Sequence, residues 1–265
     1  MSVLPPSSSI LITGASRGIG VAIATQLARP DVTLHLVSRR KEDLEDVAAQ
    51  VCEKGAEVYT YSVDLASVES LSGFLKEIKN HGFAIDMVVN NAGILGPECF
   101  PWEAEIDEWW ETQLVNVRAP FIIDRELIPL MLTRGGGRII DTSSGAAVLD
   151  DPLYSSYFVS KTALMRLGGC LHEAGRDYGL KVFEVAPGVV KTDFTKRMIM
   201  HEGRTRWNSP TEISQIIEAI ALGKLDGLSG TQLRVGVDTL PDLMQRSERG
   251  VDQNECKLRL SPWAK

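Results

Sequence analysis

The sequence predicts a doubly wound α/β fold, in which a parallel sheet of about seven strands carries helices on both faces. Short apolar runs rich in Val and Ile alternate with longer amphipathic stretches across residues 10–236. The runs are apolar on both faces, as buried parallel strands are. A glycine-rich turn joins the first run directly to the first helical stretch. The expected strands cover residues 10–12, 32–37, 57–63, 87–89, 138–140, 182–185 and 231–235.

The stretches between these runs repeat their apolar residues with the period of a helix that buries one face. Pro120 and Pro129 should kink or divide one of them, because proline removes a backbone donor and crowds the preceding turn. The expected helices begin near residues 18 and 67, cover 41–54, 106–132 and 154–178, and end with one that starts at 209.

The last of these helices has the clearest start. Ser209 can cap it, Pro210 suits the first turn, and Glu212 completes a capping box. No repeat and no Gly/Ser-rich linker interrupts the chain, so we expect one domain over all 265 residues. Its core should span about residues 8–237, and a tail over 238–265 has no evident place in the sheet.

Composition argues against several classes of partner. The net charge of −7 disfavours nucleic acid, because a nucleic-acid binder needs a basic face to replace counterions. No stretch approaches the ~20 consecutive apolar residues that cross a bilayer. The first nine residues lack the basic start and apolar run of a secretory signal. We therefore expect a soluble cytoplasmic protein.

The four cysteines and four histidines are scattered along the chain. No two cysteines form a CxxC pair, and none stands at metal-ligand spacing from a histidine. Free thiols in a reducing compartment, with no bound metal, are the expected outcome.

The turn after the first strand reads Thr13-Gly14-Ala15-Ser16-Arg17-Gly18-Ile19-Gly20. Its glycines lie between a strand and a helix, where a pyrophosphate needs close backbone approach, free N–H groups and the positive end of the helix dipole. The turn therefore predicts a dinucleotide site of the Rossmann type. The alternative is a tight turn that only packs the helix closely on the strand.

The TGxxxGxG spacing of this turn resembles the short-chain dehydrogenase/reductase family, in its single-domain branch. Other motifs of that family follow in order and cover the chain to about residue 237. They are Asn90-Asn91-Ala92-Gly93, Asn116, Ser143-Ser144, Tyr157-Phe-Val-Ser-Lys161 and Pro187-Gly188-Val-Val-Lys-Thr192. The resemblance implies an oxidoreductase that works as a homodimer or homotetramer.

Tyr157 and Lys161 are four residues apart, so on a helix they share one face. An ammonium beside a phenol favours the phenolate, and we expect Lys161 to lower the pKa of Tyr157 from about 10. Tyr157 could then give or take a proton as the general acid/base. The resemblance implies that Lys161 also holds the nicotinamide ribose.

Ser144 lies at the carboxyl end of the fifth strand, where ligands bind in such sheets. Its hydroxyl can hold the substrate oxygen beside Tyr157. Ser143 is the competing candidate, and the resemblance favours the second serine of the pair. For either serine the alternative is a hydroxyl that caps its own backbone.

Asn116 matches the fourth catalytic position of the family. The resemblance implies that it holds a water linking Lys161 to solvent. The alternative is a buried asparagine that satisfies a kinked helix near Pro120.

The end of the second strand suggests which cofactor is used. An NAD site usually has an acidic residue there for the ribose 2′-hydroxyl, but this chain has Ser38-Arg39-Arg40-Lys41. A 2′-phosphate would offset three cations at a helix start, so we predict NADP(H), with Arg17 reaching the same phosphate. A solvated basic helix start is the alternative. For Asp64, which matches the family's adenine contact, the alternative is a strand-end turn carboxylate.

The complete set of predicted cofactor contacts follows from these motifs. It comprises Gly14, Ser16, Arg17, Gly18, Ile19, Gly20, Ser38, Arg39, Arg40, Asp64, Leu65, Asn91, Ala92, Gly93, Tyr157, Lys161, Pro187, Gly188, Val190 and Thr192.

Apolar side chains on three loops should line the substrate pocket, which predicts a ketone or aldehyde with a hydrophobic body. The expected activity is hydride transfer between NADP(H) and a carbonyl or secondary alcohol. A non-catalytic NADP(H)-binding regulator is the alternative, and epimerisation or dehydration is a third possibility. The pocket candidates are Leu95, Leu149, Leu153, Tyr154, Phe194, Met198 and Trp207. Asp150 and Asp151 could favour a cationic substrate or form a solvated turn, and Trp109 and Trp110 could support subunit contacts.

Overall fold

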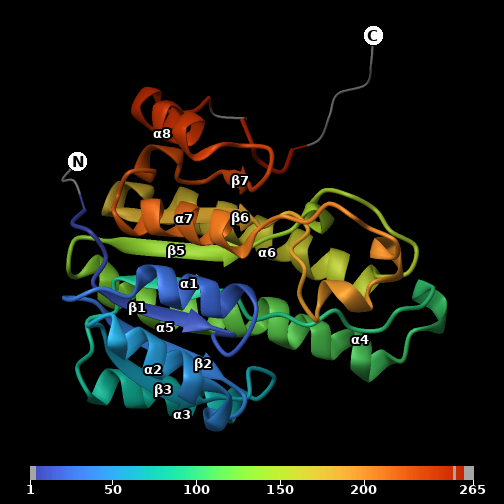
Figure 1. The fold of residues 1–265 in the computed structure, drawn as a ribbon, viewed down its shortest axis with the longest axis horizontal. Coiled ribbons are helices and arrows are strands. Elements are labelled where there is room, and N and C mark those ends of the chain that lie inside the picture. Colours follow the sequence, from blue (N-terminus) through green and yellow to red (C-terminus); the bar gives the residue numbers. More distant parts are fainter. Residues whose placement is uncertain (1–3, 253–254, 260–265) are drawn as a thin grey trace.

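A seven-stranded parallel sheet with strand order β3-β2-β1-β4-β5-β6-β7 forms the centre of the computed structural model, which describes residues 4–252 and 255–259 (Figure 1). This confirms the expected fold class. The chain moves outward from β1 in one direction and from β4 in the other, so the carboxyl ends of these two strands are where ligands of such sheets bind. The strands are β1 Ser9–Thr13, β2 Thr33–Ser38, β3 Glu57–Ser62, β4 Met87–Asn90, β5 Gly137–Thr142, β6 Leu180–Ala186 and β7 Gln232–Arg234.

Helices cover both faces of the sheet, as Figure 1 shows for α1 and α7 in front and α5 and α6 behind. Separate apolar cores lie beneath the two layers, because each strand points alternate side chains to opposite faces. The helices are α1 Ile19–Leu27, α2 Glu45–Glu53, α3 Val68–Asn80, α4 Ile106–Gln113, α5 Ala119–Leu132, α6 Ser155–Gly175, α7 Pro210–Ala221 and α8 Leu240–Arg249. None of them, in the part of the chain described, is long and apolar enough to cross a membrane.

The stretch over residues 106–132, expected to be kinked or divided, is divided just before Pro120. A π-helical turn at Leu114–Arg118 separates α4 from α5, and α5 continues through Pro129. Pro120 comes just after this π turn, and Pro129 lies in the last turn of α5. The stretch is therefore divided next to Pro120, whereas Pro129 does not end α5.

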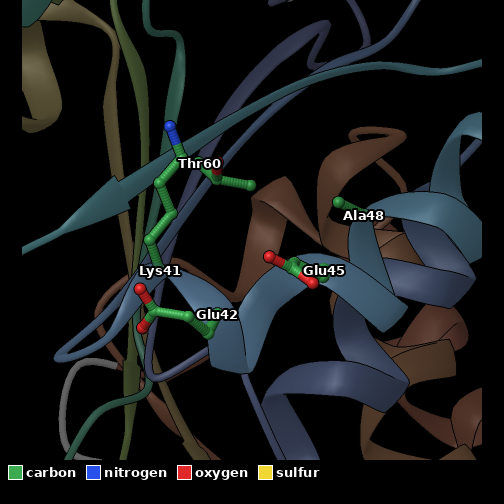
Figure 2. Close-up of a pocket in the computed structure, with 5 residues that line it drawn as sticks. All are labelled: Lys41, Glu42, Glu45, Ala48 and Thr60. Carbon is green, nitrogen blue, oxygen red and sulfur yellow. The ribbon is translucent and has the colours of Figure 1, made fainter.

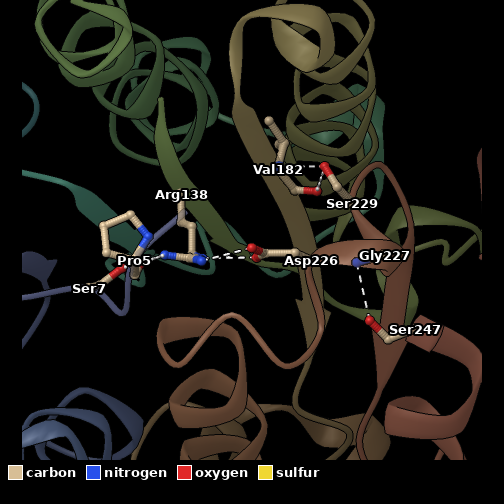
Figure 3. Close-up of polar contacts among 8 residues, drawn as sticks. All are labelled: Pro5, Ser7, Arg138, Val182, Asp226, Gly227, Ser229 and Ser247. Atoms are coloured by element: carbon tan, nitrogen blue, oxygen red, sulfur yellow. Dashed lines mark hydrogen bonds and ion pairs between the residues drawn. The ribbon is translucent and has the colours of Figure 1, made fainter. Parts of the chain in front are cut away.

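The start of α7 agrees with the sequence-based prediction, whereas the separate helix α8 was not predicted. The capping box at Ser209 and Glu212 is present as expected. The tail, which has no evident place in the sheet, forms α8 instead and buries Leu243 in the core. Ser247 of α8 accepts a hydrogen bond from the N–H of Gly227 (3.1 Å; Figure 3), which ties this helix to the loop before β7.

A buried cation holds the amino-terminal edge of the sheet together. Arg138, at the start of β5, is only 2% exposed and forms a two-pronged ion pair with Asp226 (2.9 and 2.7 Å; Figure 3). Its third nitrogen donates to the carbonyl oxygen of Pro5 (2.8 Å) and to the Ser7 hydroxyl (3.2 Å). One guanidinium thus joins β5, the segment before β1 and the loop before β7.

Replacing Arg138 with alanine should destabilise the fold without changing the opposite, carboxyl-end edge of the sheet. Asp226 would keep a partly buried charge with no partner, a change that typically costs about 3–5 kcal/mol. Chemical denaturation of Arg138→Ala checks this against Arg125→Ala, which removes an exposed arginine and should change stability by less than about 0.5 kcal/mol. Equal stabilities of the two variants would contradict a stabilising role for the Arg138 ion pair.

Candidate active site

The glycine turn is fixed to the end of β4 by a network centred on Thr13. The Thr13 hydroxyl oxygen accepts from the backbone N–H groups of Asn91 and Ala92, both at 3.1 Å. The Asn91 side-chain amide donates to the carbonyl oxygens of Thr13 (3.0 Å) and Gly14 (3.1 Å). Two motifs that are far apart in sequence therefore form one rigid unit at the carboxyl ends of β1 and β4.

The same turn offers a cradle that only glycine permits. Gly14 has φ +65°, and a Cβ there would stand 2.8 Å from the Cα of Ala92. Gly18 precedes α1 with φ +57°, and no side chain caps the first N–H groups of that helix. These N–H groups and the helix dipole fit a pyrophosphate, so the turn can hold a dinucleotide between Ser16 and Ile19.

The segment after β6 closes the other side of this cradle. A Cβ at Gly18 would stand 3.3 Å from the Thr192 methyl group. Val190 is buried and forms an isolated bridge with Asn208, while Pro187 and Gly188 connect it to the strand. The structure thus brings the predicted residues of 187–192 next to the glycine turn.

Tyr157 lies on α6 with its side chain 8% exposed, and Ser144 reaches it from the loop after β5. Ser144 is close enough to the phenol to lower its pKa, and its hydroxyl oxygen accepts from the N–H of Ala146 (3.1 Å). The capping alternative and the contact with Tyr157 are therefore both realised. Ser143 instead accepts from the Gln232 side chain on β7 (3.2 Å), so Ser144 is the serine that meets Tyr157.

Lys161 lies behind Tyr157, where its Nζ donates to the carbonyl oxygen of Thr142 (2.7 Å) and stands 5.8 Å from the centroid of the phenol ring. Burial lowers the pKa of Lys161 to about 8, against the opposing effects of Glu184 and Asp141.

The pKa of Tyr157 moves in the direction opposite to the one expected from its lysine neighbour. Burial raises it to about 12, and only the hydrogen bond from Ser144 works against that rise. Removal of the phenol from water therefore outweighs the proximity of Lys161, whose ammonium is directed to a carbonyl oxygen. At neutral pH Tyr157 is a phenol that holds its proton.

Asn116 occupies the π turn and satisfies its side chain with protein groups. Its oxygen accepts from the N–H of Ile94 (2.8 Å), and its amide donates to the Ile94 carbonyl and the Ser160 hydroxyl (both 2.9 Å). A Cβ at Gly93 would lie 3.4 Å from the Asn116 oxygen and 3.8 Å from Lys161 Nζ. Asn116 therefore joins the loop after β4 to α6 beside Lys161, and its side-chain partners lie outside the helix that contains Pro120.

The arginines predicted to contact the cofactor differ in whether they form an ion pair within the chain. Arg40 forms a two-pronged pair with Asp43 (3.1 and 2.8 Å), while the buried Ser38 hydroxyl donates to the carbonyl oxygen of Arg40. Arg39 and Arg17 are exposed and form no ion pair with any other described residue. These two cations are the ones open to a phosphate.

Lys41 is not placed to contact a 2′-phosphate. Figure 2 shows its side chain extending toward Thr60 of β3, in a pocket that Glu42 and Glu45 also line. Two carboxylates make this pocket unsuitable for a phosphate.

Asp64 and Leu65 follow β3, at the same edge of the sheet. The Asp64 carboxylate accepts from the N–H of Ala66 (2.9 Å), which is the turn role given above as its alternative. Leu65 is buried in the core. Asp64 is itself exposed, so this turn leaves it at the protein surface.

Apolar groups surround Tyr157 on its open side. The Phe194 ring lies 5.5 Å from the Tyr157 ring, and the hydroxyl of buried Tyr154 accepts from the N–H of Ile199 (2.9 Å). Five predicted pocket residues gather in this cluster: Leu95, Leu153, Tyr154, Phe194 and Met198.

The remaining pocket candidates, Leu149 and Trp207, are not part of this buried cluster. Leu149 is 63% exposed, and the Trp207 ring nitrogen donates to the carbonyl oxygen of Arg204 (3.1 Å). Asp151 accepts from the N–H groups of Leu153 and Tyr154 (2.8 and 3.2 Å), which is the turn role given above as its alternative.

Three buried carboxyl groups near Lys161 were missed by the sequence analysis. Asp141 lies on β5, Glu184 beside it on β6, and Asp124 on α5. The available signal was an acidic residue inside each of two otherwise apolar strand runs. No group of His, Cys, Asp and Glu among the described residues is arranged to hold a metal ion.

The glycine cradle beside the ends of β1 and β4, and a buried tyrosine with serine and lysine neighbours, form a candidate site for dinucleotide-linked proton and hydride chemistry. A sequence profile described as short chain dehydrogenase matches residues 8–203. The chain belongs to the short-chain dehydrogenase family and is a dehydrogenase or reductase that acts on CH–OH or C=O groups.

Known relatives cover most of the chain. Short chain dehydrogenase pigC of Monascus ruber is 26% identical over 95% of this chain and 86% of its own length. The structure of NAD⁺-bound xylitol dehydrogenase matches with a TM-score of 0.78 and 25% identity, over 86% of this chain and 96% of that one. A gluconate 5-dehydrogenase from Burkholderia cenocepacia, in complex with NADP and tartrate, matches with a TM-score of 0.77 and 26% identity, over 86% and 93%.

Proposed function

We propose that this protein uses NADP(H) to reduce a carbonyl group to a secondary alcohol, with Tyr157 as the proton donor. The observation that carries the proposal is the buried Tyr157 phenol, which has Lys161 Nζ 5.8 Å from its ring centroid and the Phe194 ring 5.5 Å away. Burial raises the pKa of Tyr157 to about 12, so the phenol keeps its proton at neutral pH. A proton donor is what carbonyl reduction requires, because negative charge develops on the substrate oxygen.

Each residue of the site has a distinct task in this scheme. When bound, the reduced nicotinamide supplies the hydride. Ser144 holds the substrate oxygen beside Tyr157, and Tyr157 transfers its phenolic proton to that oxygen. Lys161, fixed by the Thr142 carbonyl, offsets the charge left on Tyr157 and would hold the nicotinamide ribose. Asn116 keeps the loop after β4 in place against α6.

The preference for NADP(H) rests on the end of β2. No acidic residue stands there to receive a ribose 2′-hydroxyl, and Arg39 and Arg17 are exposed at the carboxyl-end edge of the sheet. Structures similar to this chain include proteins bound to NAD⁺ and to NADP. The side chains at this edge favour the phosphorylated cofactor.

The apolar groups around Tyr157 favour a ketone or aldehyde with a hydrophobic body, since such pockets bury most of the ligand surface. A homo-oligomeric state and a cytoplasmic location complete the proposal. Trp110 is 57% exposed on α4 and could lie between subunits, whereas the Trp109 ring donates to Ser155 (3.1 Å) within the chain.

Tyr157→Phe should reduce turnover by about 10²–10⁴-fold, the usual contribution of a general acid, while NADPH still binds. A panel of hydrophobic ketones and aldehydes, followed by loss of NADPH absorbance, measures turnover, and fluorescence titration measures cofactor binding. Tyr61→Phe is the matched control, because it removes the hydroxyl of another buried tyrosine, which contacts His35 on β2. Turnover by Tyr157→Phe equal to that of the control would exclude Tyr157 as the donor.

Arg39→Ala should lower kcat/KM with NADPH by about ten-fold or more, as expected for one lost charge-assisted hydrogen bond, and should leave kcat/KM with NADH nearly unchanged. Arg17→Ala should act in the same direction. Steady-state kinetics with the two cofactors give the ratio, and Arg125→Ala serves as the control for loss of an exposed positive charge. A wild-type enzyme that prefers NADH would refute the assignment.

The pH dependence of reduction should follow Lys161. Its ammonium is present below a pKa of about 8 and is lost above it. Reductive kcat/KM should therefore be level up to that pH and fall as the pH rises further. Lys161→Arg, if active, should move the fall to higher pH, because guanidinium keeps its proton. Activity that rises through the same range would indicate that the phenolate form is required instead.

A further inference from the structure

The interior behind Lys161 contains more acidic groups than one ammonium can balance. Asp124, Asp141 and Glu184 are 1%, 0% and 5% exposed, and Lys161 is 4% exposed. A buried charge without a partner costs several kcal/mol. One carboxylate balances one ammonium, so two of the three acids should keep their protons.

The contacts indicate which acid is ionised. Asp141 accepts from the side-chain amide of Asn90 (2.9 Å) and interacts with Glu184 and Lys161, so burial raises its pKa only to about 6. Burial, reinforced by the charge of Asp141, raises the pKa values of Asp124 and Glu184 well above the usual range for carboxyl groups.

Asp141 and Glu184 lie directly side by side, as partners in the parallel register of β5 and β6. Oδ2 of Asp141 and both carboxyl oxygens of Glu184 are buried, and no donor among the described groups meets ordinary hydrogen-bond geometry with them. The Ser143 hydroxyl is a polar neighbour of Glu184 and works against the rise of its pKa. A proton between the two carboxyl groups would satisfy them, because a protonated carboxyl group donates to a carboxylate.

The missing side chain of Gly168 on helix α6 leaves space for the two carboxyl groups. A Cβ at Gly168 would stand 2.3 Å from Oε1 of Glu184 and 3.4 Å from Oδ2 of Asp141. Gly168, Glu184 and Gln232 also line a pocket of about 520 Å³, so this pocket adjoins the Glu184 side of the pair.

We propose that Asp141 and Glu184 share one proton and that the single negative charge of the pair keeps Lys161 in its ammonium form behind Tyr157. Both are positioning residues, since they act on the proton donor through Lys161. Asp141 faces Lys161 from β5, Glu184 from β6 and Tyr157 from its own helix, while Asp124 on α5 adjoins Asp141 through Asn90. The inference rests on the role proposed for Lys161.

The charge of the pair has a distinctive consequence for substitutions. Glu184→Gln leaves the carboxylate of Asp141. Asp141→Asn leaves Glu184 without a negative neighbour, so Glu184 ionises beside Lys161 in its place. Only the double variant removes the anion altogether, so the two substitutions should be strongly non-additive.

Nuclear magnetic resonance of ¹⁵N-labelled lysine tests this in the apo protein. The Lys161 signal is assigned by its loss in Lys161→Arg. Each single variant should weaken proton binding by Lys161 less than about three-fold, and the double variant by about ten-fold or more, since an adjacent opposite charge is lost. Asp124→Asn, which removes a neutral buried acid, is the matched control and should leave the titration unchanged. A double variant equal to wild type, or to the sum of the single variants, would overturn the proposal.

Infrared spectroscopy gives an answer even if the double variant does not fold. At pH 7 the wild type should show the C=O stretch of a protonated carboxyl group that is absent from both Glu184→Gln and Asp141→Asn. Asp124→Asn should leave that component in place. The protonated Asp124 gives a second component, which should be lost only in Asp124→Asn. Survival of the first component in Asp141→Asn would show that no proton is shared.

These spectroscopic measurements need no substrate. They can therefore contradict the shared proton while Tyr157 is still the proton donor, or support the shared proton while Tyr157 is not. If both hold, the double variant should show reductive kcat/KM falling at a lower pH than in wild type. A loss of structure alone would not move that pH. An unchanged profile in a folded double variant would overturn the link between the pair and Lys161.

Discussion

The site is organised around one constraint, which is that an ammonium is buried between α6 and the end of β5. Lys161 is 4% exposed and has one backbone acceptor, the Thr142 carbonyl. A cation in that position needs negative charge nearby. The acidic residues that act on it are Asp141 on β5 and Glu184 on β6. The same burial keeps the Tyr157 phenol protonated, so the charge state of the whole site follows from its exclusion of water.

The sheet determines where these groups meet. Neighbouring parallel strands end at a common edge, so Thr13, Asn90 and Thr142 deliver three different loops to one place. Residues with no sequence proximity then become partners, as with Thr13 and Asn91 or Ser144 and Tyr157. The opposite edge carries the Arg138 ion pair and takes no part in the site, so the parts that stabilise the fold are separated from those that react.

Local patterns predicted most of the fold, because strand burial, helix period and the Ser209 cap each depend on neighbouring residues. The glycine turn and the Tyr157–Lys161 spacing could be recognised for the same reason. The π turn at Leu114–Arg118 and the helix α8 have no such local marker. The direction of the Tyr157 pKa shift, the capture of Arg40 by Asp43 and the pairing of Asp141 with Glu184 depend on burial and strand register, which exist only after folding.

The attachment of the glycine turn to β4 separates the position of the turn's backbone from the charge of the side chains around it. Thr13 and Asn91 make the turn and the strand end a single block, so the backbone that would receive a pyrophosphate cannot shift on its own. Arg17 and Arg39 lie at the periphery of that block and contribute only side chains. Substitutions at Arg17 or Arg39 would therefore change the charge beside the turn without moving its backbone.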